Sequence, residues 1–114
     1  MGDLVRLGEI RRRRQGPVCF TRPELNLLLS LYSRRVMLGE WRDYALRLAP
    51  GMAAFSIFKS ALDKPLYTVS KFRPGALGPT GDYLVSQGSK RLKQAKSLAE
   101  ALEAVDRRPH LVYG

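Results

Sequence analysis

The 114-residue sequence has only one cysteine, Cys19, and one histidine, His110. A single cysteine cannot form a disulfide within the chain, so nothing in the composition indicates an oxidising compartment. Protein metal sites need three or four cysteine, histidine or carboxylate ligands at a recognisable spacing, and the sequence shows none. We therefore expect no metal and no cofactor. The apolar neighbours of Cys19 predict a buried, unreactive thiol.

Long apolar runs are also missing. The longest stretches, Leu27–Leu29 and Gly51–Phe55, are far shorter than the roughly 20 residues that cross a bilayer. Residues 1–10 alternate charged and apolar side chains and lack the apolar segment of a signal peptide. These absences predict a cytoplasmic protein that does not span a membrane.

Acidic residues are scarce relative to basic ones. Twenty Lys and Arg against ten Asp and Glu give a formal net charge of +10. A surplus of this size attracts phosphates, anionic lipid or acidic proteins, and it does not by itself specify a fold. The basic residues include two clusters. The first consists of Arg11, Arg12, Arg13 and Arg14, and the second of Lys90, Arg91, Lys93 and Lys96.

The first cluster precedes a change in composition at Gln15-Gly16-Pro17. We expect residues 1–16 to form a mobile basic arm and residues 17–114 to form a single domain. A hydrophobic content of 45% is enough for one core in a chain of this length.

A capping box opens the first expected helix. The Thr21 hydroxyl can accept from the Glu24 backbone N–H while the Glu24 carboxylate accepts from the Thr21 N–H. Apolar residues at helical spacing follow up to about residue 38, and Gly39 can supply the left-handed residue that commonly ends a helix. The residues expected to form the buried face are Leu25, Leu28, Leu29, Tyr32 and Val36, widened by Leu27 and Leu31.

From Asp43 onward the apolar period becomes two, which indicates strands. Turn signals at residues 49–52, 62–65, 74–81 and 87–89 divide this part of the chain into four to five strands. Ser97 then begins a second capping box, and a helix is expected over about residues 98–108. Strands bracketed by two helices predict an α+β fold with an antiparallel sheet packed against helices at about 22–38 and 98–108.

The densest group of functional side-chain types is Glu40-Trp41-Arg42-Asp43-Tyr44. In one interpretation Trp41 or Tyr44 contacts a partner while Arg42 binds a phosphate or carboxylate. In the other interpretation, which we favour, both aromatic rings enter the core and Arg42 pairs with a neighbouring acid. The carboxylate pairs in the chain lack a pocket signature, so we expect them to be caps or ion-pair partners and the protein not to be an enzyme.

The segment from Lys90 to Lys96 has two interpretations of equal weight. In a regular strand, Lys90, Leu92 and Gln94 would face one side, and Arg91, Lys93 and Ala95 the other. A basic strand beside an arginine-rich arm could follow a phosphate backbone. Alternatively, lysines at the edge of a sheet protect that edge from pairing with another chain.

Several strings in the chain resemble a known family. They are Phe20-Thr21-Arg22-Pro23-Glu24-Leu25, Leu31-Tyr32-Ser33-Arg34, Gly39-Glu40-Trp41-Arg42-Asp43-Tyr44-Ala45, Phe55-Ser56-Ile57-Phe58 and Pro65-Leu66-Tyr67. Together they resemble small alphaproteobacterial proteins that share a domain of unknown function, with the Gly-Glu-Trp-Arg-Asp-Tyr-Ala string as the specific motif. The resemblance spans about residues 17–112. It implies a bacterial source and transfers no activity.

These observations predict a non-enzymatic binding module for an anionic partner, foremost the backbone of RNA or DNA. The expected contact residues are Arg11, Arg12, Arg13, Arg14, Trp41, Arg42, Lys90, Arg91, Lys93 and Lys96. The alternative is a subunit that docks on an acidic protein surface of a larger assembly. The sequence does not define the oligomeric state.

Overall fold

The computed structural model describes residues 18–60 and 64–106. Two helices and five strands follow one another in these residues. They are α2 (Arg22–Met37), β1 (Asp43–Ala49), β2 (Met52–Phe58), β3 (Tyr67–Phe72), β4 (Tyr83–Gln87), β5 (Lys90–Ala95) and α3 (Leu98–Asp106). The expected arm over residues 1–16 and the predicted end of the second helix lie outside the described residues.

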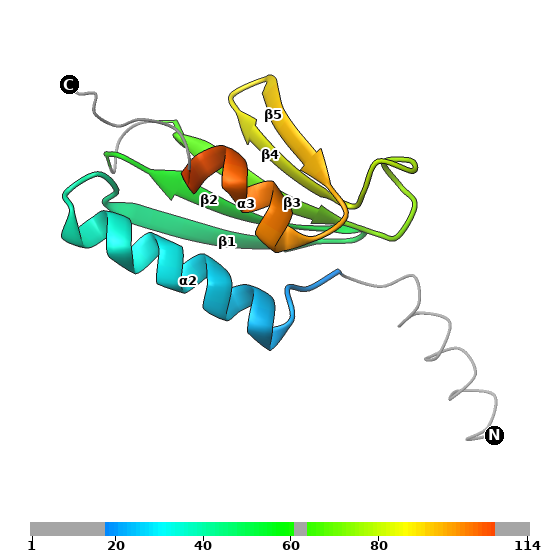
Figure 1. Ribbon diagram of the computed structural model, residues 1–114, viewed down its shortest axis with the longest axis horizontal. Coiled ribbons are helices and arrows are strands. Elements are labelled where there is room, and N and C mark those ends of the chain that lie inside the picture. The colour runs from blue at the N-terminus through cyan, green and yellow to red at the C-terminus, as the bar shows by residue number, and fades with distance from the viewer. Residues whose placement is uncertain (1–17, 61–63, 107–114) are drawn as a thin grey trace.

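The five strands form one antiparallel sheet in the order β1-β2-β3-β4-β5, so each strand pairs with its neighbour in the chain. Both helices lie on the same face of this sheet, with α2 along β1 and α3 nearer β4 and β5 (Figure 1). The α+β prediction is therefore confirmed. The opposite face of the sheet carries no helix among the described residues, and we call it the open face.

Local sequence signals define both ends of α2. The Thr21 hydroxyl accepts from the Glu24 N–H at 3.3 Å and the Glu24 carboxylate accepts from the Thr21 N–H at 2.8 Å, as the capping box predicts. At the other end Gly39 has a φ of +78°. The Gly39 N–H donates to the Val36 carbonyl and the Glu40 N–H donates to the Arg35 carbonyl, which is the Schellman arrangement.

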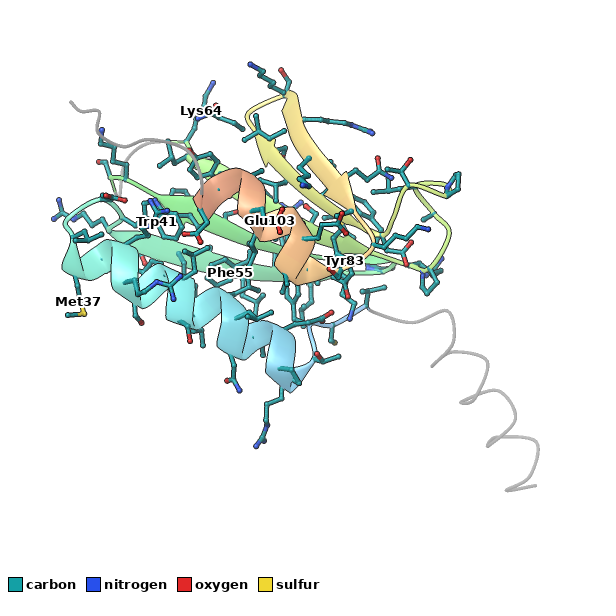
Figure 2. All side chains as sticks on the ribbon, viewed as in Figure 1. Met37, Trp41, Phe55, Lys64, Tyr83 and Glu103 are labelled. Atoms are coloured by element: carbon teal, nitrogen blue, oxygen red, sulfur yellow. The ribbon has the colours of Figure 1, made fainter. Side chains whose placement is uncertain are left out.

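The buried face of α2 differs from the prediction. Leu28, Leu31 and Arg35 are buried, whereas Leu29 and Val36 are more than a third exposed. Leu25 and Tyr32 of the predicted face also pack against the core. The prediction was therefore correct in period, but the buried face is rotated toward α3, so that it includes Arg35 and leaves Leu29 and Val36 exposed. Figure 2 shows Met37 at the end of α2 pointing away from the sheet.

The core fills the space between the sheet and the two helices. Phe55, Ile57, Val69 and Val85 contribute from the strands and are at most 1% exposed. The helices, the loops and the remaining strand positions contribute Phe20, Leu28, Leu31, Trp41, Ala53, Tyr67, Ala95, Leu98, Ala101, Leu102 and Val105. This core covers one face of the sheet, so alternate strand residues point to the open face.

A β-bulge in β5 changes which residues share a face. Val85 pairs with Lys93, but the adjacent Ser86 pairs with Arg91, so Leu92 is an extra residue in the strand. Leu92 packs against the core. The expected simple alternation over Lys90–Gln94 is therefore wrong, and the bulge places Arg91 on the open face with Gln94.

Glu24 connects the start of α2 to the sheet. Its carboxylate accepts a hydrogen bond from the Tyr83 hydroxyl and another from the Lys71 ammonium group, which is 2.8 Å away. Burial raises the pKa of Glu24, but the hydrogen bonds from Lys71, Tyr83 and the Thr21 N–H outweigh it, so the net pKa lies below the usual 4.5. Burial and the hydrogen bond to Glu24 raise the pKa of Tyr83 above its usual range.

Because the pKa of Glu24 is lowered by folding, its contribution to stability is complete above about pH 4.5 and is lost as the pH falls through the folded-state value. Glu24→Gln should lower the free energy of unfolding by about 2 kcal/mol at neutral pH, since hydrogen bonds to a charged group are lost. Urea unfolding at a series of pH values measures this difference, which should shrink in acid. The exposed Glu100→Gln is the control, and an equal loss in both variants would contradict the account.

Candidate functional site

Arg35 is the centre of a buried polar cluster at the end of α2. It is only 6% exposed. Its guanidinium group donates to the Glu40 carboxylate at 2.7 Å, to the Asp106 carboxylate at 3.1 Å and to the Asp106 carbonyl at 3.0 Å. It also lies 5.5 Å from the ring centre of Trp41, within the range of a cation–π interaction. The cluster joins α2, the loop before β1 and the end of α3.

Trp41 belongs to this cluster and to the core. It is 3% exposed, and Figure 2 shows it between the helices and the sheet. The core interpretation of Trp41 is therefore the correct one, and its ring is not presented to a partner. Tyr44 differs, because it stacks on Phe55 at 5.0 Å between ring centres but stays 41% exposed.

The two acids of the same segment have structural contacts. Glu40 binds Arg35, and the Asp43 carboxylate accepts from the Tyr44 N–H at 2.8 Å. Arg42, which we expected to pair with one of them if the core interpretation held, has no ion-pair partner among residues 18–60 and 64–106. Its side chain is exposed at the start of β1.

The structure separates the predicted basic residues of β5. Lys90, Arg91 and Lys96 are exposed. Lys93 instead lies 3.5 Å from Glu103 of α3, on the helix-covered face. The arginines Arg11–Arg14 lie outside the described residues.

Ion pairs within the fold involve most of the acidic residues of the described part but few of its basic residues. The described residues include thirteen Lys and Arg and seven Asp and Glu. Four of these acids, Glu24, Glu40, Glu103 and Asp106, form the ion pairs that join described residues, and they engage only three bases. Arg73 apart, nine basic and three acidic groups of the described part lie outside these pairs. Glu24 and Glu103 connect the helices to the sheet, and Glu40 and Asp106 connect α2 to the loop before β1 and to α3.

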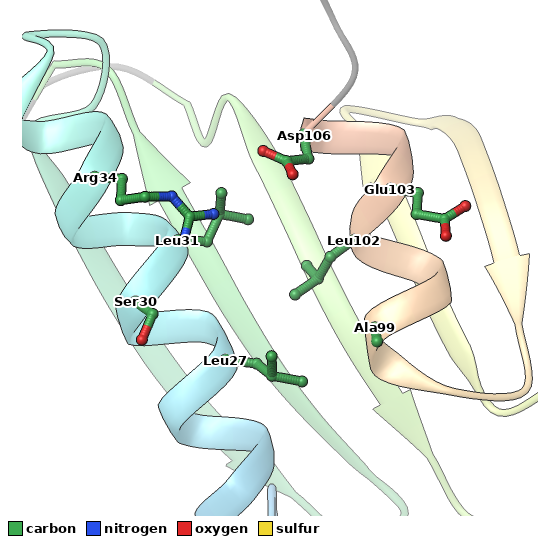
Figure 3. Close-up of a pocket in the computed structure, with 8 residues that line it drawn as sticks. All are labelled: Leu27, Ser30, Leu31, Arg34, Ala99, Leu102, Glu103 and Asp106. Atoms are coloured by element: carbon green, nitrogen blue, oxygen red, sulfur yellow. The ribbon is translucent and has the colours of Figure 1, made fainter.

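Two of the grooves among the described residues lie on opposite sides of the sheet. The first, of about 170 Å³, runs between α2 and α3, with Leu27, Leu31 and Leu102 pointing into it and Arg34, Glu103 and Asp106 around it (Figure 3). Because it carries both signs of charge, it is not selective for an anion.

The second groove, of about 410 Å³, lies on the open face. Small side chains form much of its lining, and Arg47 is its only charged lining residue. The other lining residues are Ala45, Met52, Ala54, Ser56, Phe58, Pro65 and Thr68. Arg91 projects from the same face of the sheet. This groove is the better place for an anionic ligand.

Sequence reasoning missed Arg35 and misplaced Cys19. Arg35 lies seven residues after Leu28 and four after Leu31, so the correct helix phase puts it on the buried face. Cys19 is exposed, contrary to the prediction, because Phe20 rather than Cys19 enters the core.

In the part of the chain that the structure describes, no three metal-ligating side chains come together. Neither described helix is long and apolar enough to cross a membrane.

The fold and these surfaces define a small α+β protein with a five-stranded antiparallel meander, two helices on one face and a basic exterior. The chain belongs to the family described as protein of unknown function (DUF2794), which matches residues 18–102. No curated protein and no solved structure matches it. The family resemblance is thereby confirmed, while the bacterial source and the motif stay predictions.

Removing the Arg35 guanidinium should destabilise the fold strongly, because Glu40 would stay partly buried without its cation. We expect Arg35→Ala to lower the free energy of unfolding by about 3 kcal/mol. The neighbouring exposed Arg34→Ala should change it by less than about 0.5 kcal/mol. Trp41 is the only tryptophan in the sequence, so its fluorescence during urea unfolding reports on this cluster. Similar losses of unfolding free energy in the Arg35→Ala and Arg34→Ala variants would contradict the conclusion that the Arg35 contacts stabilise the fold.

Proposed function

We propose that this protein is a non-enzymatic binding module whose partner is an RNA or DNA, contacted mainly through the phosphate backbone. The observation that carries the proposal is the division of charge. Four acids are engaged in ion pairs within the fold, and most cations lie outside those pairs. Such a surface attracts a polyanion and releases its counterions on binding.

The open face supports the same proposal. It offers a groove lined by Arg47 with a floor of alanine, serine and threonine, and Arg91 lies on the same face. Lys90 precedes Arg91 at the start of β5, Lys96 follows the end of that strand, and both are exposed. Small side chains allow a backbone or a base to approach the sheet closely, and the exposed cations can contact phosphates along its length.

The proposed contact residues therefore differ from those expected from the sequence alone. Arg42, Lys90, Arg91 and Lys96 stay in it because they are exposed, and Arg47 joins them from the groove. Trp41 leaves it because it is buried, and Lys93 contributes less because Glu103 is its neighbour. Arg11–Arg14 would add sequence-independent contacts from the segment before the described residues.

Fluorescence anisotropy of the full chain with a labelled single-stranded RNA and a labelled DNA duplex tests this function. The logarithm of the binding constant should fall linearly with the logarithm of the salt concentration. Lys90→Ser/Arg91→Ser/Lys96→Ser removes three exposed charges and should make this slope shallower by about 2 to 3.

The control Arg22→Ser/Arg34→Ser/Lys59→Ser removes the same charge from exposed positions elsewhere and should change the slope less. Equal effects of the two triple variants would show that β5 is not the contact surface. Absence of binding to both probes at low salt would overturn the nucleic-acid proposal itself.

A further inference from the structure

A continuous apolar band lies on the side of α2 that faces β1, and neither the core nor α3 covers it. From β1, Tyr44, Leu46 and Leu48 are 41%, 46% and 51% exposed. From α2, Leu29 and Val36 are 37% and 38% exposed, with the half-buried Leu25 and Tyr32 beside them. We call these seven residues the apolar band.

Two observations show that the seven residues of the apolar band form one surface across α2 and β1. The rings of Tyr32 and Tyr44 meet edge to face at 4.9 Å, which joins the helix to the strand. Leu27 and Leu31 line the groove toward α3, so the other side of the helix turns toward β1. Leu25, Leu29, Tyr32 and Val36 lie on that other side at helical spacing.

The apolar band borders an unpaired sheet edge. Among residues 18–60 and 64–106, β1 is the first strand of the sheet and pairs only with β2, and every residue from Asp43 to Leu48 is exposed. Soluble proteins usually protect such an edge with lysine, proline, a bulge or a covering element. β1 contains no lysine or proline and pairs with β2 in register over all seven residues. An edge of this kind is available to pair with a strand of another chain.

The sequence of β1 is complementary to itself. In an antiparallel pair of two β1 strands centred on Ala45, Asp43 of each copy lies opposite Arg47 of the other. Tyr44 then lies opposite Leu46 on the helix-covered face. Opposite charges and aromatic–aliphatic pairs both stabilise neighbouring strands. In a dimer with a two-fold axis, each of these favourable pairs occurs twice, once on either side of the axis.

We propose that the apolar band and the β1 edge form the interface between two copies of this chain. The dimer joins two sheets through β1 and buries the apolar band of each copy. The band contains no charged residue, so it has no cation to pair with a phosphate or a carboxylate, whereas a second copy supplies a matching apolar surface. A helix of 16 residues is about 24 Å long, which gives the interface a substantial length.

Light scattering after size-exclusion chromatography, over a range of protein concentrations, measures the state of the full chain. The unmodified protein should be a dimer. Leu46→Lys puts a charge in the apolar band and should weaken the dimer at least about tenfold. Leu27→Lys is the matched control, because Leu27 is 44% exposed but lies on the α3 side of the helix.

A charge exchange tests the register independently. The Asp43→Arg substitution places an arginine opposite Arg47 of the second copy at both ends of the strand pair, so like charges should weaken the dimer. The double variant Asp43→Arg/Arg47→Asp again places opposite charges there and should restore the dimer. Circular dichroism establishes that each variant is folded, so a loss of dimer can be assigned to the interface. Hydrogen exchange should show protection of β1 amides that increases with protein concentration.

A protein that stays monomeric at all concentrations would overturn the proposal. A dimer that tolerates both Leu46→Lys and Asp43→Arg would also overturn it, because the contact would then lie elsewhere. Weakening by both variants, with recovery in the charge-exchanged protein, would establish this interface.

Discussion

The Arg35 guanidinium group is the contact on which the arrangement of the helices depends. It binds Glu40 and Asp106 and lies over the ring of Trp41, so a single side chain joins α2, the loop before β1 and the end of α3. A buried cation of this kind is favourable only when its hydrogen bonds are made, and here both helices and the loop must be in place to make them. At the other end of α2, Glu24 holds the helix to β3 and β4 through Lys71 and Tyr83.

These contacts determine what remains on the surface. The described part of the chain has few acids, and the fold engages four of them in pairs with three bases. The basic groups outside these pairs outnumber the acidic ones, so the exterior of the described part keeps a positive charge. The helix-covered face contains the core, while the open face and the β1 edge carry no covering helix or strand among the described residues.

Much of the fold followed from local signals in the sequence. The capping box at Thr21, Gly39 at the end of α2 and the alternation in β1 and β2 act over a few residues, and the structure confirms them. The errors concern tertiary contacts. The phase of α2 depends on the position of α3, and the bulge at Leu92 depends on how β5 follows β4, so neither could be predicted from periodicity.

The candidate site was predictable only in part. The exposed positions of Lys90, Arg91 and Lys96 agree with a surface patch, but the burial of Trp41 and the pairing of Lys93 with Glu103 depend on residues distant in the sequence. Arg35 was missed because only apolar residues were assigned to the buried face of the helix and arginine is seldom fully buried. Its place on the buried face becomes clear once Leu28 and Leu31 are known to be the core positions.

The central claim is that the cations left outside the internal ion pairs bind nucleic acid. Purification of the full chain at low salt, with absorbance at 260 and 280 nm compared before and after nuclease treatment, tests it most directly. The account predicts nucleic acid in the untreated preparation and its removal by nuclease or high salt. Protein that is free of nucleic acid at low salt without nuclease would contradict it.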